Sequence, residues 1–254
     1  DLIEPILAYD VVGLGLIGGS LAKSTKFRTA HTVYGIDLDS DTMMMARMCG
    51  AIDAPLTDET LPDCDLILIA IRPGAAVRWV ESHAHLISKK AILVDMCGVK
   101  RTVVSAIAPI AEEHGFSYIG GHPMAGREQG GFTASTDSLY VGASMILTPD
   151  KRTDMLLLET LKHFFLDLGF ANLTFSDPEE HDRIIAFTSQ LAHITSSAYI
   201  KSPEAQRRRR EQEERSRNRI AIIAIVVCAA LAIASIGVFL FLTVQTMEKR
   251  RWNG

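Results

Sequence analysis

Three glycines at a fixed spacing could hold the phosphates of a dinucleotide. Gly13, Gly15 and Gly18 form a G-x-G-x-x-G set within Val-Val-Gly-Leu-Gly-Leu-Ile-Gly-Gly-Ser. In such a set the first glycine makes a tight turn, the second lets a pyrophosphate approach the backbone, and the third lets a helix pack on the preceding strand. The backbone N–H groups at the start of that helix, at Leu16 and Ile17, would face the anion. The spacing predicts a dinucleotide-binding turn.

An acidic residue follows the glycines at the distance that such a turn requires. Asp37 ends the next apolar run, 19 residues after Gly18. A carboxylate there would accept hydrogen bonds from the adenosine ribose hydroxyls and would repel a 2′-phosphate, which favours NAD over NADP. Asp39 could take the same role, and a solvated acid at a strand end is the alternative for either residue.

A histidine in a Gly/Pro-rich segment could act as a base. His122 lies in Gly120-Gly121-His122-Pro123-Met124, directly after an apolar run that ends at Ile119. Loops at the carboxyl ends of strands in an open α/β sheet face the ligand, so His122 would point toward a bound nicotinamide. A histidine with a pKa near neutrality can take a proton from a hydroxyl group. A purely structural histidine is the alternative.

The elements that would position these residues alternate along the chain. Short apolar runs alternate with helix-length segments, which predicts an α/β fold of the Rossmann type, a doubly wound parallel sheet with helices on both faces. The expected strands are 9–13, 32–37, 65–71, 91–95, 117–119, 143–147 and 171–175. The expected helices are 16–26, 41–49, 75–86, 100–114 and 151–168. Residues 1–176 would form this dinucleotide-binding domain.

A new helix is expected after residue 176. Asp177-Pro178-Glu179-Glu180 is a helix start, with Asp as the cap and Pro in the first turn, and its pattern continues to about residue 200. We expect residues 177–206 to begin a second, helical domain. A last helix covering the sheet is the alternative.

The composition changes sharply at residue 207. Residues 207–219 carry seven arginines, and residues 220–244 are 25 residues without a charge. A helix of that length would reach about 37 Å, enough to cross a hydrocarbon core of about 30 Å. A transmembrane helix is therefore expected over 220–244 with a short tail over 245–254, and the arginines would place residues 1–219 in the cytoplasm. A buried core helix is the alternative.

Charge and cysteine content exclude several classes of function. The formal charge of −4 divides into +6 for residues 207–254 and −10 for the rest. An acidic body disfavours nucleic acid as the partner. The four cysteines form no C-x-x-C pair, so neither a disulfide framework nor a zinc site is expected, and a reducing cytosol fits this cysteine usage.

Five motifs occur together within residues 5–206. They are G-L-G-L-I-G-G-S at 13–20, D-M-C-G-V-K at 95–100, G-H-P-M-A-G-R-E at 121–128, His-Asp at 181–182 and S-Q-L-A-H at 189–193. With these motifs the sequence resembles the prephenate dehydrogenase family. The resemblance implies NAD-dependent oxidative decarboxylation of prephenate to 4-hydroxyphenylpyruvate in tyrosine biosynthesis, with arogenate as a related substrate.

The resemblance also assigns roles to single residues. His122 would accept the proton of the ring C4 hydroxyl while hydride leaves C4 for the nicotinamide. Glu128 would line the substrate entrance, His193 would help to hold the substrate, and His181 would lie in a supporting position. Many members have a serine beside the catalytic histidine, where this sequence has Gly98. Family members also continue into helices that form a homodimer and supply an arginine for a prephenate carboxylate, and residues 207–254 do not resemble those helices.

Four interpretations of the whole chain remain open at this point. The leading one is a dehydrogenase of the prephenate type. The second is a membrane-tethered NAD-binding module without turnover, and the third is a chain joined near residue 206 from two unrelated pieces. The fourth is a dehydrogenase of the hydroxyacid type, which would explain the glycines but not the segment around His122.

Overall fold

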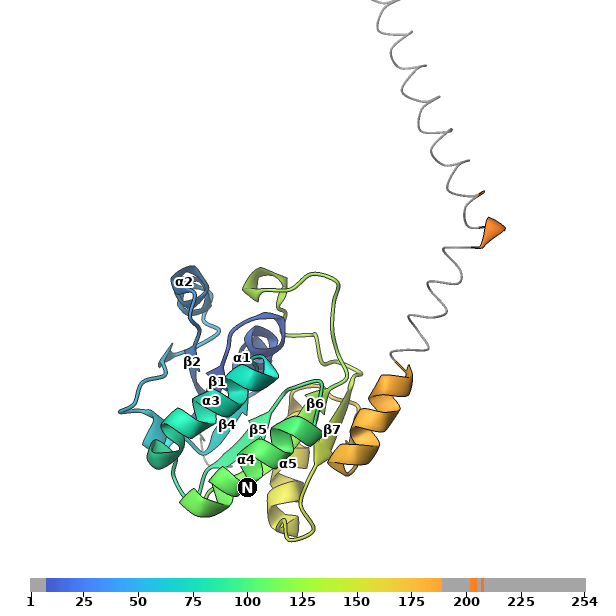
Figure 1. Ribbon diagram of the computed structural model, residues 1–254. Coiled ribbons are helices and arrows are strands. Elements are labelled where there is room, and N and C mark those ends of the chain that lie inside the picture. The colour runs from blue at the N-terminus through green and yellow to red at the C-terminus, as the bar shows by residue number, and fades with distance from the viewer. Residues whose placement is uncertain (1–7, 189–201, 205–206, 208–254) are drawn as a thin grey trace, which may run out of the picture. The chain divides into compact units, whose positions relative to one another are not determined.

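The computed structural model describes residues 8–188, 202–204 and 207 (Figure 1). The chain divides into two compact units, Asp1–Phe187 and Thr188–Gly254. The first unit is an α/β domain, as expected, and it also contains the start of the helix that was expected to open a second domain. The strands and helices of this unit carry the glycine turn, Asp37 and His122.

Eight strands form one sheet in the order β3-β2-β1-β4-β5-β6-β7-β8. The strands are β1 (Ala8–Val12), β2 (Thr32–Ile36), β3 (Ala54–Pro55), β4 (Leu66–Ile69), β5 (Ile92–Asp95), β6 (Ser117–Pro123), β7 (Ser144–Thr148) and β8 (Asn172–Phe175). The chain starts at β1 in the middle of the sheet, moves outward to β3, and then returns through β4 to the other side. This reversal creates a crevice beside the carboxyl ends of β1 and β4, where open α/β sheets bind their ligands.

Helices cover both faces of the sheet (Figure 1). They are α1 (Leu16–Arg28), α2 (Ser40–Met48), α3 (Pro73–His83), α4 (Arg101–His114) and α5 (Met155–Asp167). Alternate residues of β4 enter different cores: Ile67 and Ile69 pack with residues of α3 and α4, whereas Leu66 and Leu68 pack with residues of α1 and α5. All four residues of β4 are buried, which is why the strand reads as a continuous apolar run.

The expectation of a wholly parallel sheet is wrong at one position. β7 runs antiparallel to β6, and the pairing opposes His122 to Ile146 and Pro123 to Met145. β6 therefore continues four residues beyond Ile119, where a loop was expected to begin. Gly120 and Gly121 permit this, because a Cβ on Gly121 would lie 2.7 Å from the Asp95 carbonyl oxygen of β5.

A further helix begins at residue 178 and is described to residue 188. The Asp177 carboxylate accepts hydrogen bonds from the backbone N–H groups of Glu179 (3.0 Å) and Glu180 (2.9 Å), so Asp177 is its cap, as expected. The segments expected at 207–219, 220–244 and 245–254 lie almost wholly outside the described residues. Within the part of the chain that the structure describes, no helix has both the length and the apolar character needed to cross a membrane.

Candidate functional site

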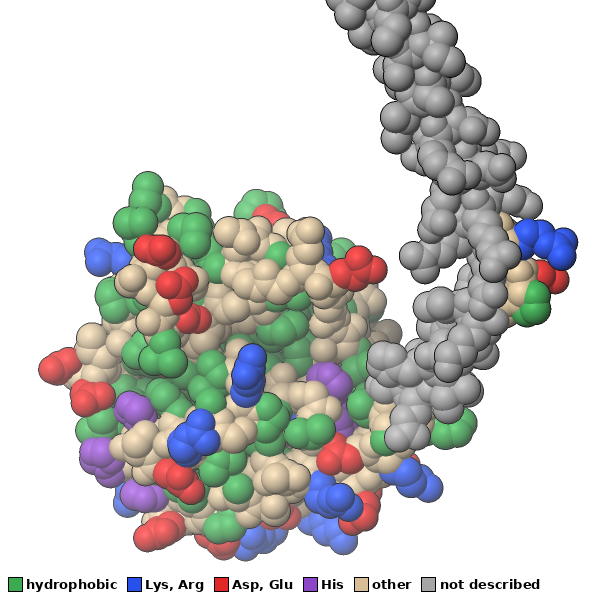
Figure 2. Space-filling view, turned by 45° about the horizontal axis from the view of Figure 1, so that its top comes forward, with side chains coloured by type: hydrophobic (Ala, Val, Ile, Leu, Met, Phe, Trp, Pro, Cys, Tyr) green, Lys and Arg blue, Asp and Glu red, His purple; other side chains and the backbone are tan. Residues whose placement is uncertain are grey.

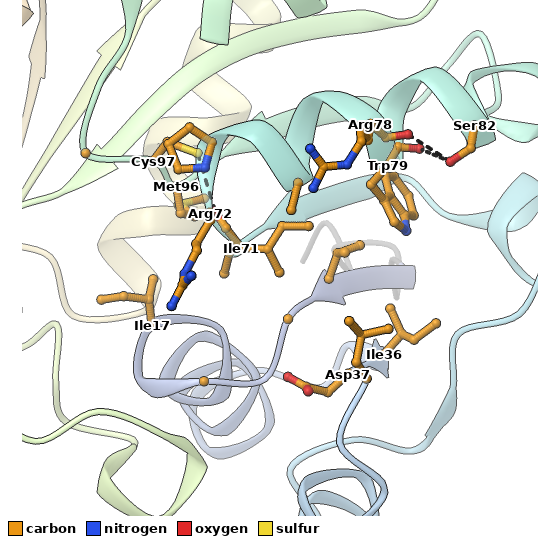
Figure 3. Close-up of a pocket in the computed structure, with 18 residues that line it drawn as sticks. Ile17, Ile36, Asp37, Ile71, Arg72, Arg78, Trp79, Ser82, Met96 and Cys97 are labelled. Carbon is orange, nitrogen blue, oxygen red and sulfur yellow. Dashed lines mark hydrogen bonds between the residues drawn. The ribbon is translucent and has the colours of Figure 1, made fainter. Parts of the chain in front are cut away.

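An open cavity of about 740 Å³ lies at the carboxyl ends of β1, β2, β4 and β5. In Figure 2, turned to bring the top of Figure 1 forward, hydrophobic side chains line a hollow with Lys and Arg side chains beside it. Figure 3 shows the cavity between the glycine turn below and α3 above. The lining residues are Val12, Gly13, Gly15, Ile17, Ile36, Asp37, Leu38, Ala70, Ile71, Arg72, Pro73, Ala75, Arg78, Trp79, Ser82, Met96, Cys97 and Gly98.

The glycine turn has the geometry of a phosphate-binding turn. Gly13 has φ +88°, a left-handed conformation that favours glycine, and it joins β1 to the N-terminal end of α1. A Cβ on Gly18 would collide with the Gly13 carbonyl oxygen, so glycine there allows α1 to pack on the strand. A Cβ on Gly15 would meet nothing within 4 Å, which leaves that side of the turn open to the cavity.

Asp37 lies at the cavity end of β2 and is tied to the glycine turn. One carboxylate oxygen accepts a hydrogen bond from the Leu14 N–H (2.8 Å) and the other from the Asp39 N–H (3.0 Å). A carboxylate has about four acceptor positions, so two remain for ribose hydroxyls. Asp39, by contrast, caps α2 by accepting from the backbone N–H of Thr42 (3.1 Å). Of the two acids, Asp37 alone lines the cavity.

Three residues of the cavity were not expected from the sequence. Arg72, Arg78 and Trp79 line the cavity from the N-terminal end and one side of α3. The signal that could have revealed Arg72 is its place between a buried strand and a proline that starts a helix, since that position faces the ligand in this type of sheet.

His122 forms the first link of a hydrogen-bonded chain on the other side of Gly98. Its Nδ1 lies 2.9 Å from Nε2 of His181, and Nδ1 of His181 lies 2.8 Å from a carboxylate oxygen of Asp182. The side chain of His181 has no exposed surface. The other ring nitrogen of His122, Nε2, lies 3.7 Å from the position that a Cβ would take on Gly98, a lining residue of the cavity.

This chain of hydrogen bonds fixes which nitrogen of His122 is basic. A carboxylate only accepts, so Nδ1 of His181 donates to Asp182, and the neutral His181 ring must accept at Nε2. His122 therefore donates from Nδ1, and its unprotonated nitrogen is Nε2, the one that faces the cavity end. An imidazole held in this way can remove a proton from a hydroxyl group placed beside Gly98.

Asp182 is itself held by the start of α4. Its two carboxylate oxygens accept hydrogen bonds from the backbone N–H groups of Lys100 (2.7 Å) and Arg101 (2.9 Å). Burial alone would raise the pKa of Asp182, but these N–H bonds and the bond from His181 outweigh it and lower the pKa. Asp182 is therefore a carboxylate at neutral pH, and it joins the helix at 178–188 to the turn that carries Gly98.

A buried ion pair lies directly behind His122. The Lys100 ammonium donates to the Asp95 carboxylate and to the carbonyl oxygen of Gly121, and neither side chain of the ion pair has exposed surface. The Tyr118 hydroxyl donates to the second Asp95 oxygen at 2.7 Å. Because every charge in this cluster is paired, the cluster can hold the backbone of β6 in place beside β5.

The pKa of His122 differs from the near-neutral value expected from the sequence. Partial burial lowers it from 6.5 to about 4, and electrostatic interactions with His181 and Lys100 act in the same direction. Asp95 and Asp182 oppose the shift but do not overcome it. The sequence could not reveal this, because the lysine next to the histidine in space is 22 residues away in the chain. At neutral pH the imidazole is free to accept a proton.

The remaining predicted site residues are not gathered here. Glu128 is exposed in the loop after β6 and lines no described wall of the cavity. His193 lies outside the described residues. His181, expected to support the substrate, is fully buried and contacts His122 instead. Among the described residues no group of His, Cys, Asp and Glu could hold a metal ion.

The fold and the site together define a dinucleotide-binding domain of the Rossmann type, with His122 beside Gly98 at one end of its cavity. The chain belongs to the prephenate dehydrogenase family, since residues 21–172 match the family model described as "Prephenate dehydrogenase, nucleotide-binding domain".

Individual relatives agree with this assignment. The chain is 29% identical to prephenate dehydrogenase of Bacillus subtilis over 194 residues, which are 75% of this chain and 52% of that protein. It is therefore similar to about half the length of that relative.

Two solved structures are similar in fold and sequence. Prephenate dehydrogenase of Aquifex aeolicus, in complex with hydroxyphenyl propionate and NAD+, has a TM-score of 0.66 at 26% identity, covering 80% of this chain and 73% of that one. Arogenate dehydrogenase of Synechocystis has a TM-score of 0.66 at 28% identity, covering 81% and 74%.

Proposed function

We propose that this chain carries the NAD-binding and proton-accepting part of a dehydrogenase that converts prephenate to 4-hydroxyphenylpyruvate and carbon dioxide. The observation that carries the proposal is the position of His122 Nε2, beside Gly98 at the end of a cavity that begins at the glycine turn. The relatives named above supply the substrate class. Arogenate is the alternative substrate, and the Synechocystis enzyme favours including it in the test.

The residues of this chain would bind the cofactor along the cavity. The N-terminus of α1 at Leu16 and Ile17 would face the pyrophosphate, and the open side of Gly15 would let it approach. Asp37 would accept hydrogen bonds from the adenosine ribose and disfavour a 2′-phosphate, which supports NAD as the cofactor.

The base would act through the histidine pair. When bound, NAD accepts the hydride that leaves C4 of the substrate ring. Nε2 of His122 takes the proton of the C4 hydroxyl. The electron pair of the broken bond to the carboxyl group passes into the ring, which becomes aromatic as carbon dioxide leaves, and the phenolate oxygen takes the proton back from His122. The imidazolium formed at His122 donates from Nδ1 to His181, whose own N–H bond to Asp182 places a carboxylate near the new charge. Glu128 and His193 would contact the substrate, as the resemblance implies.

The direct test is formation of NADH with prephenate, repeated with arogenate and with NADP. A His122→Asn variant keeps the size and one hydrogen-bonding group but loses the base. Its rate should be about 10²- to 10⁴-fold lower, the usual contribution of a positioned general base, with NAD affinity unchanged. A variant rate within about threefold of the wild type would contradict the role of His122.

The composition of residues 207–254 favours a second candidate, a membrane-tethered NAD-binding module without turnover. Here residues 177–206 would begin a helical domain, the arginines of 207–219 would contact anionic lipids from the cytoplasmic side, and residues 220–244 would cross the bilayer. NAD binding without NADH formation, in the full chain and in a variant ending at Gln206, would favour this candidate.

For the first candidate, the active dehydrogenase, we expect a homodimer, as in the family.

A further inference from the structure

Arg72 occupies a position that none of the predicted roles uses. It follows β4 directly and precedes Pro73, the first residue of α3. The β4–α3 connection lies against the glycine turn, because a Cβ on Gly13 would collide with the Ile71 side chain. In Figure 3 the side chain of Arg72 leaves this connection and extends toward Ile17, in the first turn of α1. Its guanidinium group thus lies in the cavity, near the first turn of α1 that follows the glycines.

The charge of Arg72 is not neutralised by any carboxylate that the structure describes. Arg101 and Arg152, in contrast, pair with Glu179 and Glu112. The acid that lines the cavity, Asp37, is occupied with backbone N–H groups and does not pair with Arg72. A free guanidinium group therefore lies in a cavity whose other lining residues are mainly apolar or glycine.

We propose that Arg72 binds the pyrophosphate of the dinucleotide together with the N–H groups of the glycine turn. The inference rests on the proposed function, which places a dinucleotide in this cavity. A pyrophosphate carries two negative charges, and residues 1–206 carry a formal charge of −10, so a local cation offsets the repulsion at the site. Arginine also suits phosphate oxygens because its planar group forms two parallel hydrogen bonds.

The neighbouring arginine provides a matched control. Arg78 also lines the cavity and is exposed, but it lies further along α3, beside Trp79. Figure 3 places Trp79 above Ile36 and Asp37, the adenosine side of the cavity. A change at Arg78 should therefore affect ligands with and without phosphates to the same degree.

The experiment compares ADP-ribose, NAD and adenosine by calorimetric titration of the full chain. Arg72→Met should bind NAD and ADP-ribose about 10- to 100-fold more weakly, the cost of a lost charge-assisted hydrogen bond, with adenosine unchanged. Arg72→Lys keeps the charge and should recover part of the loss. The deficit of Arg72→Met should shrink as salt is added, because ions screen an exposed charge pair. Arg78→Met should leave the ratio of ADP-ribose to adenosine affinity unchanged.

Two results would overturn the inference while leaving the proposed function intact. One is wild-type affinity of Arg72→Met for NAD and ADP-ribose. The other is normal NAD binding combined with a raised KM for prephenate, which would assign the guanidinium group to a substrate carboxylate. Failure of the wild-type chain to bind NAD would overturn both the proposed function and the inference.

Discussion

His122 owes its properties to neighbours that are distant in the sequence. His181 and Asp182 set which nitrogen is basic, and Lys100 and burial set how strongly it holds a proton. A pKa of about 4 keeps the ring neutral over the physiological range, the state that the proposed base requires. The cost is a weaker base than one with a pKa near 7.

This low pKa predicts an unusually flat pH profile. A base with the ordinary histidine pKa of 6.5 would lose about 30-fold in kcat/KM between pH 8 and about pH 5. With a pKa of about 4, His122 should stay unprotonated, and kcat/KM should vary by less than about twofold over that range. Initial rates of NADH formation measure the profile. A steep fall below about pH 6.5 would contradict the low pKa.

A second residue-scale prediction concerns Gly98. A Cβ at this position would lie 3.7 Å from Nε2 of His122, and no other described atom outside its chain neighbours lies closer to it. The hydroxyl group of a serine placed here could therefore reach the ring nitrogen. We expect Gly98→Ser to raise kcat by about 2- to 10-fold through one added hydrogen bond. Gly98→Ala is the control, because it adds the same Cβ without the hydroxyl. Equal rates for the two variants would refute the contact.

Asp10 makes stability depend on pH in the middle of the sheet. It is fully buried in β1, and burial raises its pKa to about 7, although the neighbouring Cys64 thiol acts in the opposite direction. The unfolded chain releases this proton near pH 3.9. Between those values the folded state binds more protons, so the group's contribution to stability is present below about pH 4 and is lost as the pH rises to 7.

Asp10→Asn should remove that dependence. The free energy of unfolding should fall less between pH 5 and pH 7 than in the wild type, and the variant should be the more stable of the two at pH 8. Urea unfolding at several pH values measures this. Asp58→Asn, a change of an exposed acid, is the control. An unchanged slope in Asp10→Asn would show that another group causes the pH dependence.

At the scale of elements, the regular parts of the fold were predictable from sequence and the site geometry was only partly so. Buried strands such as β4 and capped helices such as that after Asp177 have local signals, and the structure confirms them. β3 has two residues and gives no apolar run, so it was missed. The extension of β6 was missed because it depends on pairing with β7, a contact between segments more than 20 residues apart.

The link between the helix at 178–188 and α4 can be tested at Asp182. Asp182→Asn should lower the free energy of unfolding by about 1–2 kcal/mol, because the carboxylate accepts two N–H bonds at the start of α4. It should also lower kcat, because an amide holds the His181 N–H less strongly. Asp177→Asn is the matched control, since asparagine caps a helix as well as aspartate does. Equal stability and rate in the two variants would refute the link.

At the scale of the whole molecule, we expect the apolar residues 220–244 to lie in a membrane and the acidic domain to lie in water. Fifteen of residues 220–244 are Ile, Val, Leu or Phe. Each contributes about −0.3 to −0.6 kcal/mol to insertion at the centre of a helix, so insertion should be favourable. We expect the full chain to stay in the membrane fraction after carbonate extraction and a variant ending at Gln206 to be released. Recovery of both in the supernatant would refute the anchor.

The mounting of His122 on β6 has an evolutionary consequence. Its backbone is paired with β7, and the nearby Gly120 is paired with β5, so the sheet fixes where the imidazole lies. The loop that follows, which carries Glu128, is exposed and belongs to none of that pairing. Insertions, deletions or substitutions in this loop can therefore accumulate without displacing His122. Under the proposed function, substrate preference could change in this loop, one mutation at a time, while the proposed base keeps its position.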